Sequence, residues 1–384
     1  MKVGVPKEIA SGETRVALVP KMVGLLKKAG AEVLVERDAG EASSFSNTEY
    51  EEAGATIVGD APSLYSEADV IMKVQPPQHN EKAGKHEAEM IKPGSTFIGF
   101  LAPIENRDVI QQMVDKKITS FSMEFVPRIA RAQSMDALSS MANIAGYQAV
   151  LIAAQRLGKF FPLMMTAAGT IPPARVLILG AGVAGLQAIA TARRLGARVE
   201  AFDVRPAVRE QVESLGAQFI EMEFEEDAEA AGGYAKEMSD AFLLKEREII
   251  GGRLDRMDAV ISTAQIFGKR APVLITEEMV QQMKEGSVII DLAAGDGGNC
   301  ELTEAGKDVV RHGVTSYGPL NLPATLPVDA SQMYSKNITN LFRNLYGDED
   351  GALDFEDEIT KGACITHNGE IVNEMVNNAF QEEG

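Results

Sequence analysis

The sequence predicts an α/β protein with two Rossmann-like domains, whose parallel sheets are joined by long helices and flank a cleft. One observation is a complete strand, helix and strand between Ala174 and Asp203, with glycines in a G-x-G-x-x-G spacing. A second is the order of helix, glycine, small residue and strand, which recurs along the chain. A third is that two segments of the first half resemble two segments of the second half. Two α/β domains of one design account for all three observations.

The composition limits the classes of partner. The 384 residues are 45% hydrophobic, which is enough for two domains with cores of their own. The formal net charge of −19 and the lack of a basic run argue against direct binding to nucleic acid or to an anionic membrane surface. Cys300 and Cys364 are far apart and fit no metal or redox spacing. We therefore expect reduced thiols, a cytoplasmic location and no metal site.

The first elements follow a simple order. Residues 2–5 (KVGV) and 32–36 (EVLVE) are predicted strands, and the helix between them closes at Gly30. Further on, residues 66–74 resemble residues 256–264, and residues 90–102 resemble residues 282–294. The two domains are therefore expected to carry equivalent strands at these places.

The second domain contains an insertion relative to the first. Ala55 and Asp69 are 14 positions apart, whereas the matching Ala217 and Asp258 are 41 positions apart. The extra residues lie at about 223–250, around a Gly-Gly-Tyr sequence that ends at Tyr234. We predict a mobile loop that acts as a lid on the ligand side. The alternative is a surface excursion without a function.

The unit from Ala174 to Asp203 predicts a dinucleotide site. A short apolar strand leads into Gly180, Gly182 and Gly185, a helix follows to about residue 195, and a second strand ends at Asp203. Glycines let the backbone approach a pyrophosphate, whose charge then lies at the start of the helix. Asp203 stands where a carboxylate accepts hydrogen bonds from an adenosine ribose. A membrane span over residues 176–192 is excluded, because this stretch is too short and too rich in glycine.

The link between the domains, residues 124–159, carries a polar cluster. Asp136 is the expected cap of a long helix rich in small residues. A ligand cleft of a two-domain enzyme lies beside such a link, so the cluster is a candidate for the nicotinamide end of the site. A solvated linker with a helix cap is the alternative. The cluster consists of Arg128, Arg131, Gln133, Asp136 and Ser139.

The end of the chain is expected to return to the first domain. Residues 316–345 contain a proline-rich turn and a second long helix, and Asn368-Gly369 signals a hairpin. The predicted domains are therefore 1–137 plus 330–384, and 138–329, the latter binding the nucleotide. No segment after residue 345 is apolar enough to cross a bilayer, so we expect the chain itself not to insert into a membrane.

Three long motifs carry a resemblance to a known family. They are VGVPKEIASGETRVALVP, RAQSMDALSSMANIAGYQA and VLILGAGVAGLQAIATARRLGARVEAFDVRP. Together they resemble the NAD(H)-binding component of proton-translocating NAD(P) transhydrogenase and, more distantly, alanine dehydrogenase. The resemblance implies direct hydride transfer between NADH on this chain and NADP+ on a partner component, coupled to proton translocation by a membrane-spanning component. It also implies a homodimer on the cytoplasmic side of the inner membrane, attached peripherally through partner subunits.

The same resemblance assigns site residues. Arg128, Gln133 and Asp136 would be catalytic at the nicotinamide, and Tyr234 would be the tip of the closing loop. Arg205 raises the possibility of a 2′-phosphate, which Asp203 would repel, so NAD is favoured over NADP. The full set of implied cofactor-binding residues is Arg128, Gln133, Asp136, Leu138, Ser139, Gly180, Ala181, Gly182, Val183, Gly185, Asp203, Val204, Arg205, Tyr234, Thr263, Ala264 and Gln265.

An alternative is an NAD-dependent oxidoreductase like alanine dehydrogenase. Arg15 and Lys73 match the arginine and lysine with which those enzymes hold their substrate. The catalytic histidine of those enzymes has no match, because residues 97–106 read FIGFLAPIEN. Without it, an amino-acid deamination lacks a proton carrier. The insertion around Tyr234 points away from alanine dehydrogenase as well. A third possibility is a non-catalytic protein that senses NAD.

Overall fold

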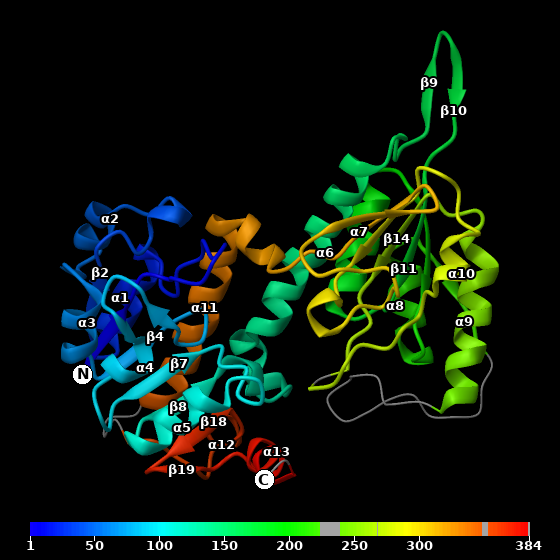
Figure 1. The fold of residues 1–384 in the computed structure, drawn as a ribbon. Helices are drawn as coiled ribbons and strands as arrows, with labels where there is room; N and C mark the ends of the chain where they lie inside the picture. Colours follow the sequence, from blue (N-terminus) through cyan, green and yellow to red (C-terminus); the bar gives the residue numbers. More distant parts are fainter. Residues whose placement is uncertain (223–238, 267, 348–351, 383–384) are drawn as a thin grey trace. The chain divides into compact units, whose positions relative to one another are not determined.

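The computed structural model describes residues 1–384 except 223–238, 267, 348–351 and 383–384 (Figure 1). The chain forms two compact units, here called unit 1 (Met1–Met141 with Pro323–Gly384) and unit 2 (Ala142–Leu322). Each unit has a mostly parallel sheet with helices, so the predicted α/β class is confirmed. The unit boundaries differ from the predicted domain boundaries by a few residues.

Unit 1 contains an eight-stranded sheet in the order β19-β18-β8-β7-β4-β1-β2-β3. Its strands are β1 (Lys2–Val5), β2 (Glu32–Glu36), β3 (Thr56–Val58), β4 (Val70–Met72), β7 (Thr96–Gly99), β8 (Thr119–Ser122), β18 (Cys364–His367) and β19 (Glu370–Ile371). Its helices are α1 (Pro20–Lys28), α2 (Asn47–Glu52), α3 (Ala61–Glu67), α4 (Glu87–Met90), α5 (Arg107–Asp115), α11 (Pro327–Tyr346), α12 (Glu358–Ala363) and α13 (Glu374–Glu382). A small hairpin joins β5 (His79–Asn80) to β6 (Lys85–His86).

The C-terminal segment belongs to unit 1, as predicted. Asn368 and Gly369 both have positive φ, 52° and 86°, which a two-residue hairpin turn requires. The turn joins β18 to β19, and β18 pairs antiparallel with β8. The long helix α11 brings the chain back to this sheet.

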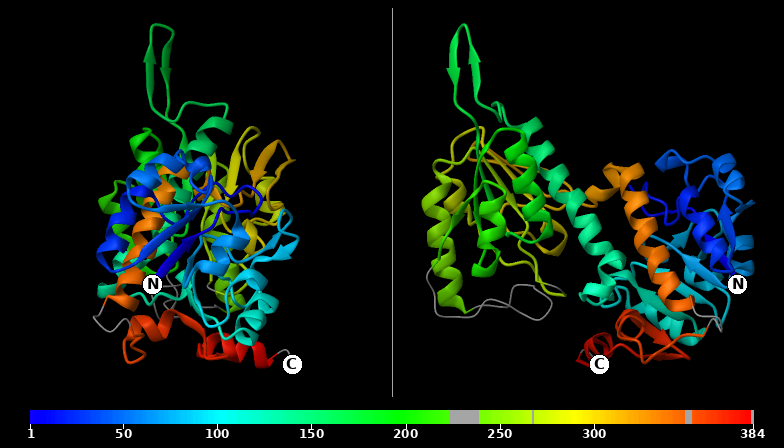
Figure 2. Two further views of the ribbon diagram at one scale, coloured as in Figure 1. Left: turned by 90° about the vertical axis from the view of Figure 1, so that its left-hand side faces the viewer. Right: turned by 180° about the vertical axis from the view of Figure 1, so that it is seen from behind.

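Unit 2 contains a seven-stranded sheet in the order β13-β12-β11-β14-β15-β17-β16. Its strands are β11 (Arg175–Leu179), β12 (Arg198–Phe202), β13 (Gln218–Ile220), β14 (Ala259–Ser262), β15 (Val288–Asp291), β16 (Asp308–Arg311) and β17 (Val314–Tyr317). Its helices are α7 (Val183–Arg194), α8 (Arg209–Ser214), α9 (Asp240–Leu254) and α10 (Glu277–Val280), with most of α6 (Ala137–Arg156). A hairpin of β9 (Met164–Thr166) and β10 (Gly169–Ile171) projects from this unit in every view (Figure 2).

The two sheets share one strand order around their central strands. In unit 1 the order is β3-β2-β1-β4-β7-β8, and in unit 2 it is β13-β12-β11-β14-β15-β17. Residues 66–74 contribute β4 and residues 256–264 contribute β14, and each lies beside the central strand. Residues 90–102 and 282–294 contribute β7 and β15, one place further out. The predicted equivalence of these segments is confirmed.

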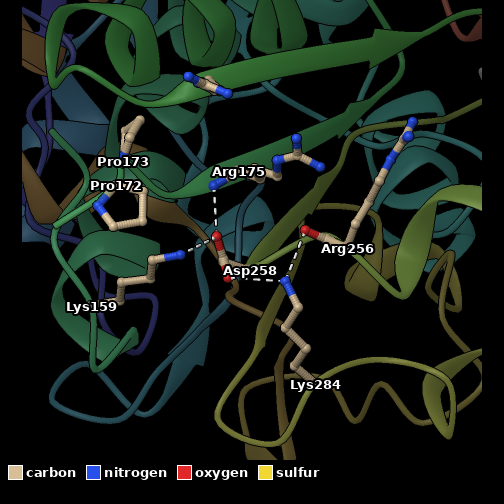
Figure 3. Close-up of a pocket in the computed structure, with 8 residues that line it drawn as sticks. Lys159, Pro172, Pro173, Arg175, Arg256, Asp258 and Lys284 are labelled. Carbon is tan, nitrogen blue, oxygen red and sulfur yellow. Dashed lines mark hydrogen bonds and ion pairs between the residues drawn. The ribbon is translucent and has the colours of Figure 1, made fainter. Parts of the chain in front are cut away.

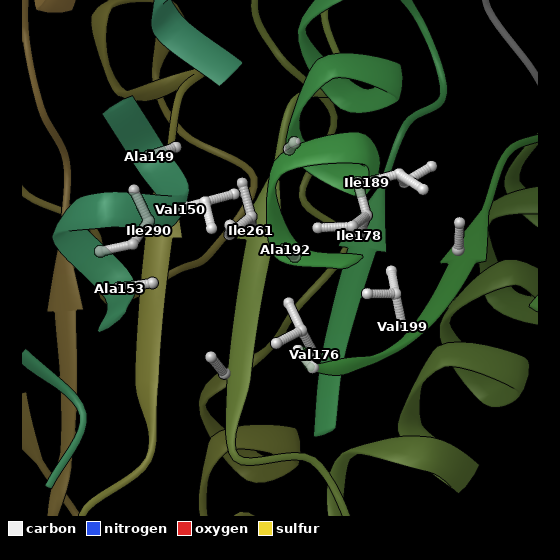
Figure 4. Close-up of a cluster of buried hydrophobic side chains, with 14 of the residues drawn as sticks. Ala149, Val150, Ala153, Val176, Ile178, Ile189, Ala192, Val199, Ile261 and Ile290 are labelled. Atoms are coloured by element: carbon white, nitrogen blue, oxygen red, sulfur yellow. The ribbon is translucent and has the colours of Figure 1, made fainter. Parts of the chain in front are cut away.

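Helices cover both faces of the sheet in unit 2. Successive side chains of a strand point to opposite faces. Val176 and Ile178 of β11 pack with Ala149 and Val150 of α6 and with α7 (Figure 4). On the other face, the alternate residues of β11 pack against α9. The small residues of α6 let it lie close to its neighbours, since a Cβ atom on Gly146 would stand 2.1 Å from the carbonyl oxygen of Ala184 in α7.

Among the described residues, α6 is the one helix long and apolar enough to cross a membrane by length and composition. Ala149, Val150 and Ala153 of α6 are fully buried in the core of unit 2. The core helix of a folded domain passes the same test, so this finding is weak support for a membrane span.

The predicted loop at about 223–250 is wrong in its second half. Residues 240–254 form α9, whose first turn is capped by the side chain of Ser239, 3.3 Å from the amide of Phe242. Burial of Phe242, Ile250 and Leu254 against the sheet stabilises this helix. Residues 223–238 lie outside the described residues, and so does Tyr234.

Candidate functional site

The glycine turn follows β11 and has no room for side chains at two of its three glycines. Gly180 has φ +91°, and a Cβ atom there would lie 2.6 Å from Oγ1 of Thr263. A Cβ atom on Gly185 would lie 1.9 Å from the carbonyl oxygen of Gly180. At Gly182, by contrast, a Cβ atom would meet no atom within 4 Å. Gly180 and Gly185 therefore allow tight packing, while Gly182 leaves space in front of the backbone for a ligand.

The start of α7 suits an anion. Gly182 is the N-cap residue, no side-chain hydrogen bond caps the helix among the described residues, and its first turn has no acidic residue. The amide groups and the positive end of the helix dipole therefore face the space at Gly182. The predicted pyrophosphate fits this cradle, formed by Gly180, Ala181, Gly182 and Val183.

The steric difference between the glycines gives a first prediction. Gly185→Ala should lower the free energy of unfolding by about 1–3 kcal/mol, because the methyl group overpacks against backbone that cannot move aside. Gly182→Ala is the matched control, and we expect it to unfold like the wild type, since its φ of −72° suits alanine. Urea unfolding of both variants measures this difference. Equal stabilities would contradict the packing role of Gly185.

Asp203 lies directly after β12 and is 8% exposed. Its Oδ2 accepts a hydrogen bond of 2.6 Å from the amide of Ala181, which joins the carboxylate to the glycine turn. The guanidinium of Arg205 donates to both carboxylate oxygens, at 2.9 and 2.7 Å, and the amide of Arg205 donates to Oδ1 at 2.8 Å.

This pairing changes the argument about the nucleotide. A carboxylate has about four acceptor sites, and Ala181 and Arg205 together donate four hydrogen bonds to Asp203. A ribose hydroxyl would have to replace one of the bonds from Arg205. The charge of Asp203 is balanced by Arg205, so simple repulsion of a 2′-phosphate is a weaker argument than the sequence suggested. Val204, the third predicted residue here, is half-buried against the core.

The segment after β14 borders the glycine turn. The hydroxyl of Thr263 lies 3.2 Å from the carbonyl oxygens of both Leu179 and Gly180. Ala264 exchanges backbone hydrogen bonds with the side chain of Asn299, at 3.1 and 2.9 Å. Gln265 donates to Asp296 at 2.8 Å. The structure therefore brings the predicted residues 263–265 together with Gly180.

Asn299 is a positioning residue that the sequence did not predict. It is buried and binds Ser262, Ala264 and Pro272 through its side chain. Its own amide donates to Asp291 at 2.7 Å, and Asp291 is the last residue of β15. An acidic residue at the end of a buried parallel strand was the available signal.

Glu246 is a second residue that the sequence analysis missed. It lies on α9 and is 5% exposed. Burial, together with the negative charge of Asp203, raises the pKa of Glu246 to about 7, although Arg247 opposes this shift. Phe242 and Ile250, four residues before and after it, are buried, so helical spacing predicts Glu246 on the buried side of α9.

The polar cluster of the linking segment lies in unit 1. Asp136 caps α6, since its two carboxylate oxygens accept hydrogen bonds from the amide and hydroxyl of Ser139, at 2.8 and 2.6 Å. The predicted cap is confirmed. Gln133 and Arg128 are exposed, and Leu138 is half-buried. Arg131 forms an ion pair with Asp357, so it serves the packing of unit 1. The remaining predicted residues all lie in unit 2 or outside the described residues.

Arg15 and Lys73, the residues that match alanine dehydrogenase, are both bound by carboxylates. The guanidinium of Arg15 donates to both oxygens of Glu13, at 2.8 and 2.6 Å. The ammonium of Lys73 is fully buried and lies 2.8 Å from both oxygens of Glu87 and 3.4 Å from Glu8. Tyr65 donates a further hydrogen bond of 2.8 Å to Glu87. Both cations are thus neutralised within the protein.

The segment where alanine dehydrogenases carry their histidine follows β7. The amides of Leu101 and Ala102 donate to the buried carboxylate of Glu124, at 2.9 and 2.8 Å. Phe100 packs its ring on Tyr334, with 5.3 Å between the ring centres. Among the described residues, no group of three or more His, Cys, Asp and Glu side chains is placed to hold a metal ion.

Family models agree with this two-unit organisation. The model described as "Alanine dehydrogenase/PNT, N-terminal domain" matches residues 4–145, and the model described as "Alanine dehydrogenase/PNT, C-terminal domain" matches residues 149–374. The chain belongs to the alanine dehydrogenase/PNT family. The resemblance seen in the three sequence motifs is thereby confirmed.

Within the alanine dehydrogenase/PNT family, the chain is more similar to transhydrogenases than to alanine dehydrogenases. The first of the polypeptides that form NAD(P) transhydrogenase subunit alpha in Rhodospirillum rubrum is 51% identical over 377 residues, which is 97% of this chain and 98% of that protein. Alanine dehydrogenase 2 of Staphylococcus aureus is 30% identical over 392 residues, covering 100% of this chain and 97% of that protein. The crystal structure of transhydrogenase from Sinorhizobium meliloti superposes with a TM-score of 0.86 and 43% identity, covering 97% of this chain and all of that one.

Proposed function

We propose that this chain is the NAD(H)-binding component of a proton-translocating transhydrogenase. In this reaction a hydride passes directly from NADH to NADP+ held by a partner component, and a membrane-spanning component couples the transfer to proton movement. The observation that carries the proposal is the neutralisation of Arg15 by Glu13 and of Lys73 by Glu87 and Glu8. These cations are the groups that would hold a substrate carboxylate in an amino-acid dehydrogenase, and neither is available to do so.

The chain's own residues have three tasks in this proposal. The glycine turn and the start of α7 bind the pyrophosphate, and Asp203 with Arg205 selects the adenosine ribose. Asn299 holds residues 262–264 against the turn. Arg128, Gln133 and Ser139 bind and orient the nicotinamide, with Asp136 fixing Ser139 through its two hydrogen bonds. No proton-carrying side chain is needed for a hydride exchange between two nicotinamides.

Mixing the chain with an NADP(H)-binding transhydrogenase component tests the proposal. We expect hydride exchange between NADH and an NADP+ analogue, and no consumption of NADH with pyruvate and ammonia. Consumption of NADH in the second assay would favour the alanine-dehydrogenase alternative. NADH binding without any exchange would favour a sensor protein, and either result would contradict our proposal.

Asp203→Asn should weaken NADH binding by about 1–3 kcal/mol, since the amide oxygen is a poorer acceptor and leaves Arg205 without its carboxylate. Calorimetric titration measures the change. Asp255→Asn is the matched control, because Asp255 is an exposed acid of the same unit at the end of α9. Unchanged affinity in the Asp203 variant would show that the ribose binds elsewhere.

Self-association is part of the proposal. Phe160, Leu163 and Met165 are large apolar side chains at and near the projecting hairpin, with exposed fractions of 52%, 53% and 79%. Exposed apolar groups gathered on one projection are typical of a contact surface. We expect a homodimer, attached to the cytoplasmic side of the inner membrane through its partner subunits. Light scattering of the purified chain measures the oligomeric state.

A further inference from the structure

A cationic pocket of about 260 Å³ lies at the edge of the sheet in unit 2 where the strands begin (Figure 3). Arg175 opens β11 and Arg198 opens β12, while Asp258 directly precedes β14. The charged residues that line the pocket are Lys159, Arg175, Arg198, Arg256, Asp258 and Lys284.

This pocket is separate from the dinucleotide site. The glycine turn and Asp203 follow the far ends of β11 and β12, whereas the pocket lies where these strands start. A strand rises by about 3.3 Å per residue, so five residues separate the two sites by roughly 15 Å. The function proposed above makes no use of this edge of the sheet.

The lining is strongly positive in a strongly negative protein. Five cationic side chains and one carboxylate line the pocket, for a net charge of +4, whereas the whole chain carries −19. Positive charge has therefore been gathered at this one place. A pocket with such a lining attracts anions and holds them by charge-assisted hydrogen bonds.

Asp258 organises the cations around itself, as the dashed lines in Figure 3 show. Its Oδ2 accepts hydrogen bonds from Nζ of Lys159 at 2.9 Å and from the amide of Arg175 at 2.7 Å. Nζ of Lys284 lies 3.7 Å from Oδ1 and donates to the carbonyl oxygen of Arg256 at 3.1 Å. Burial alone would raise the pKa of Asp258, but these hydrogen bonds and the two lysines hold it below its usual value. The carboxylate stays charged and holds both ammonium groups at the pocket.

The arginines of the pocket have donors to spare. In the described part of the chain, the guanidinium groups of Arg175 and Arg198 have neither an ion pair nor a hydrogen-bond acceptor. Nε of Arg256 is buried and also lacks an acceptor among those residues, although Nη2 pairs with Glu200 at 3.1 Å. Buried donors without acceptors are costly, so a ligand that supplies oxygen atoms would be stabilised here.

We propose that this pocket binds a small anion with one or two phosphate groups. Guanidinium groups match phosphate oxygens with two parallel hydrogen bonds, and a multivalent anion suits a lining of +4. The volume of about 260 Å³ is below the range of roughly 300–1,000 Å³ usual for whole small-molecule ligands, so the pocket holds the phosphate part alone.

Calorimetric titration of the full chain with sodium pyrophosphate and with inorganic phosphate tests this site. Saturating NADH is present, so that the glycine turn is not the place of binding. We expect pyrophosphate to bind more tightly than phosphate, and Arg198→Gln to weaken pyrophosphate binding by about tenfold, the effect of one charge-assisted hydrogen bond. Arg198 is exposed, so its removal leaves the core intact, which thermal unfolding checks.

Arg311→Gln is the matched control, since Arg311 is an exposed arginine of the same unit on β16, outside the pocket. Equal losses in the two variants would show a general charge effect and overturn the proposal. Displacement of pyrophosphate by NADH would assign the binding to the glycine turn and overturn it as well. So would a hexaglutamate peptide that binds more tightly than pyrophosphate and depends on Arg198, because the pocket would then be a protein-docking site. Hydride exchange is measured separately, so each hypothesis fails on its own assay.

Discussion

Replacing Lys73 with methionine should lower the free energy of unfolding by about 3–5 kcal/mol, the usual cost of removing one partner from a buried ion pair. Lys73 is fully buried between Glu87 and Glu8, and its loss leaves two carboxylates without a cation. Tyr65 donates one hydrogen bond to Glu87 but brings no positive charge. Urea unfolding of the full chain at pH 7 measures the effect.

Two further variants sharpen this test. Lys73→Met combined with Glu87→Gln should recover part of the lost stability, because one of the uncompensated charges is gone. Lys307→Met removes a lysine from an exposed pair with Glu304 and should leave unfolding unchanged. If Lys73 were kept for binding a substrate, its replacement would cost little stability. An unfolding curve like that of the wild type would therefore contradict the structural role.

Glu246→Gln should make the protein more stable above pH 7, by up to about 3 kcal/mol, which is the linkage value of the shift from 4.5 to about 7. The folded state raises the pKa of this carboxyl, so between pH 4.5 and 7 the folded protein holds a proton that the unfolded chain has lost. Stability therefore falls as pH rises through this window and then stays level. Glutamine cannot ionise, so the variant lacks this loss.

Calorimetric unfolding at pH 4.5, 6 and 8 checks the sign as well as the size. Wild type and Glu246→Gln should be similar at pH 4.5 and differ most at pH 8. Glu248→Gln is the control, because Glu248 lies on the same helix with an exposed side chain and should not alter the pH dependence. A variant that loses stability with pH as steeply as the wild type would exclude Glu246 as the titrating group.

Much of the fold could be predicted because its signals are local. The strands at 2–5 and 32–36 and the hairpin at Asn368-Gly369 are found where their residues predict them. The glycine turn is legible for the same reason, since Gly180 and Gly185 answer to steric limits within one strand and one helix. The second half of the predicted loop at 223–250 was misjudged, because its helix depends on burial of Phe242, Ile250 and Leu254 against a distant sheet.

By itself, the sequence determined the α/β class, the repeated domain design, the dinucleotide turn and the resemblance to the family, because these depend on neighbouring residues and their spacing. Only the tertiary structure decided how the charged side chains are used. Arg15, Lys73 and Asp203 each looked available to a ligand, yet each is paired in the folded chain, two of them with residues only two positions away. Glu246 and the cationic pocket were invisible, because they join segments far apart in the sequence. Charges act through space, and the distances between them are set by folding.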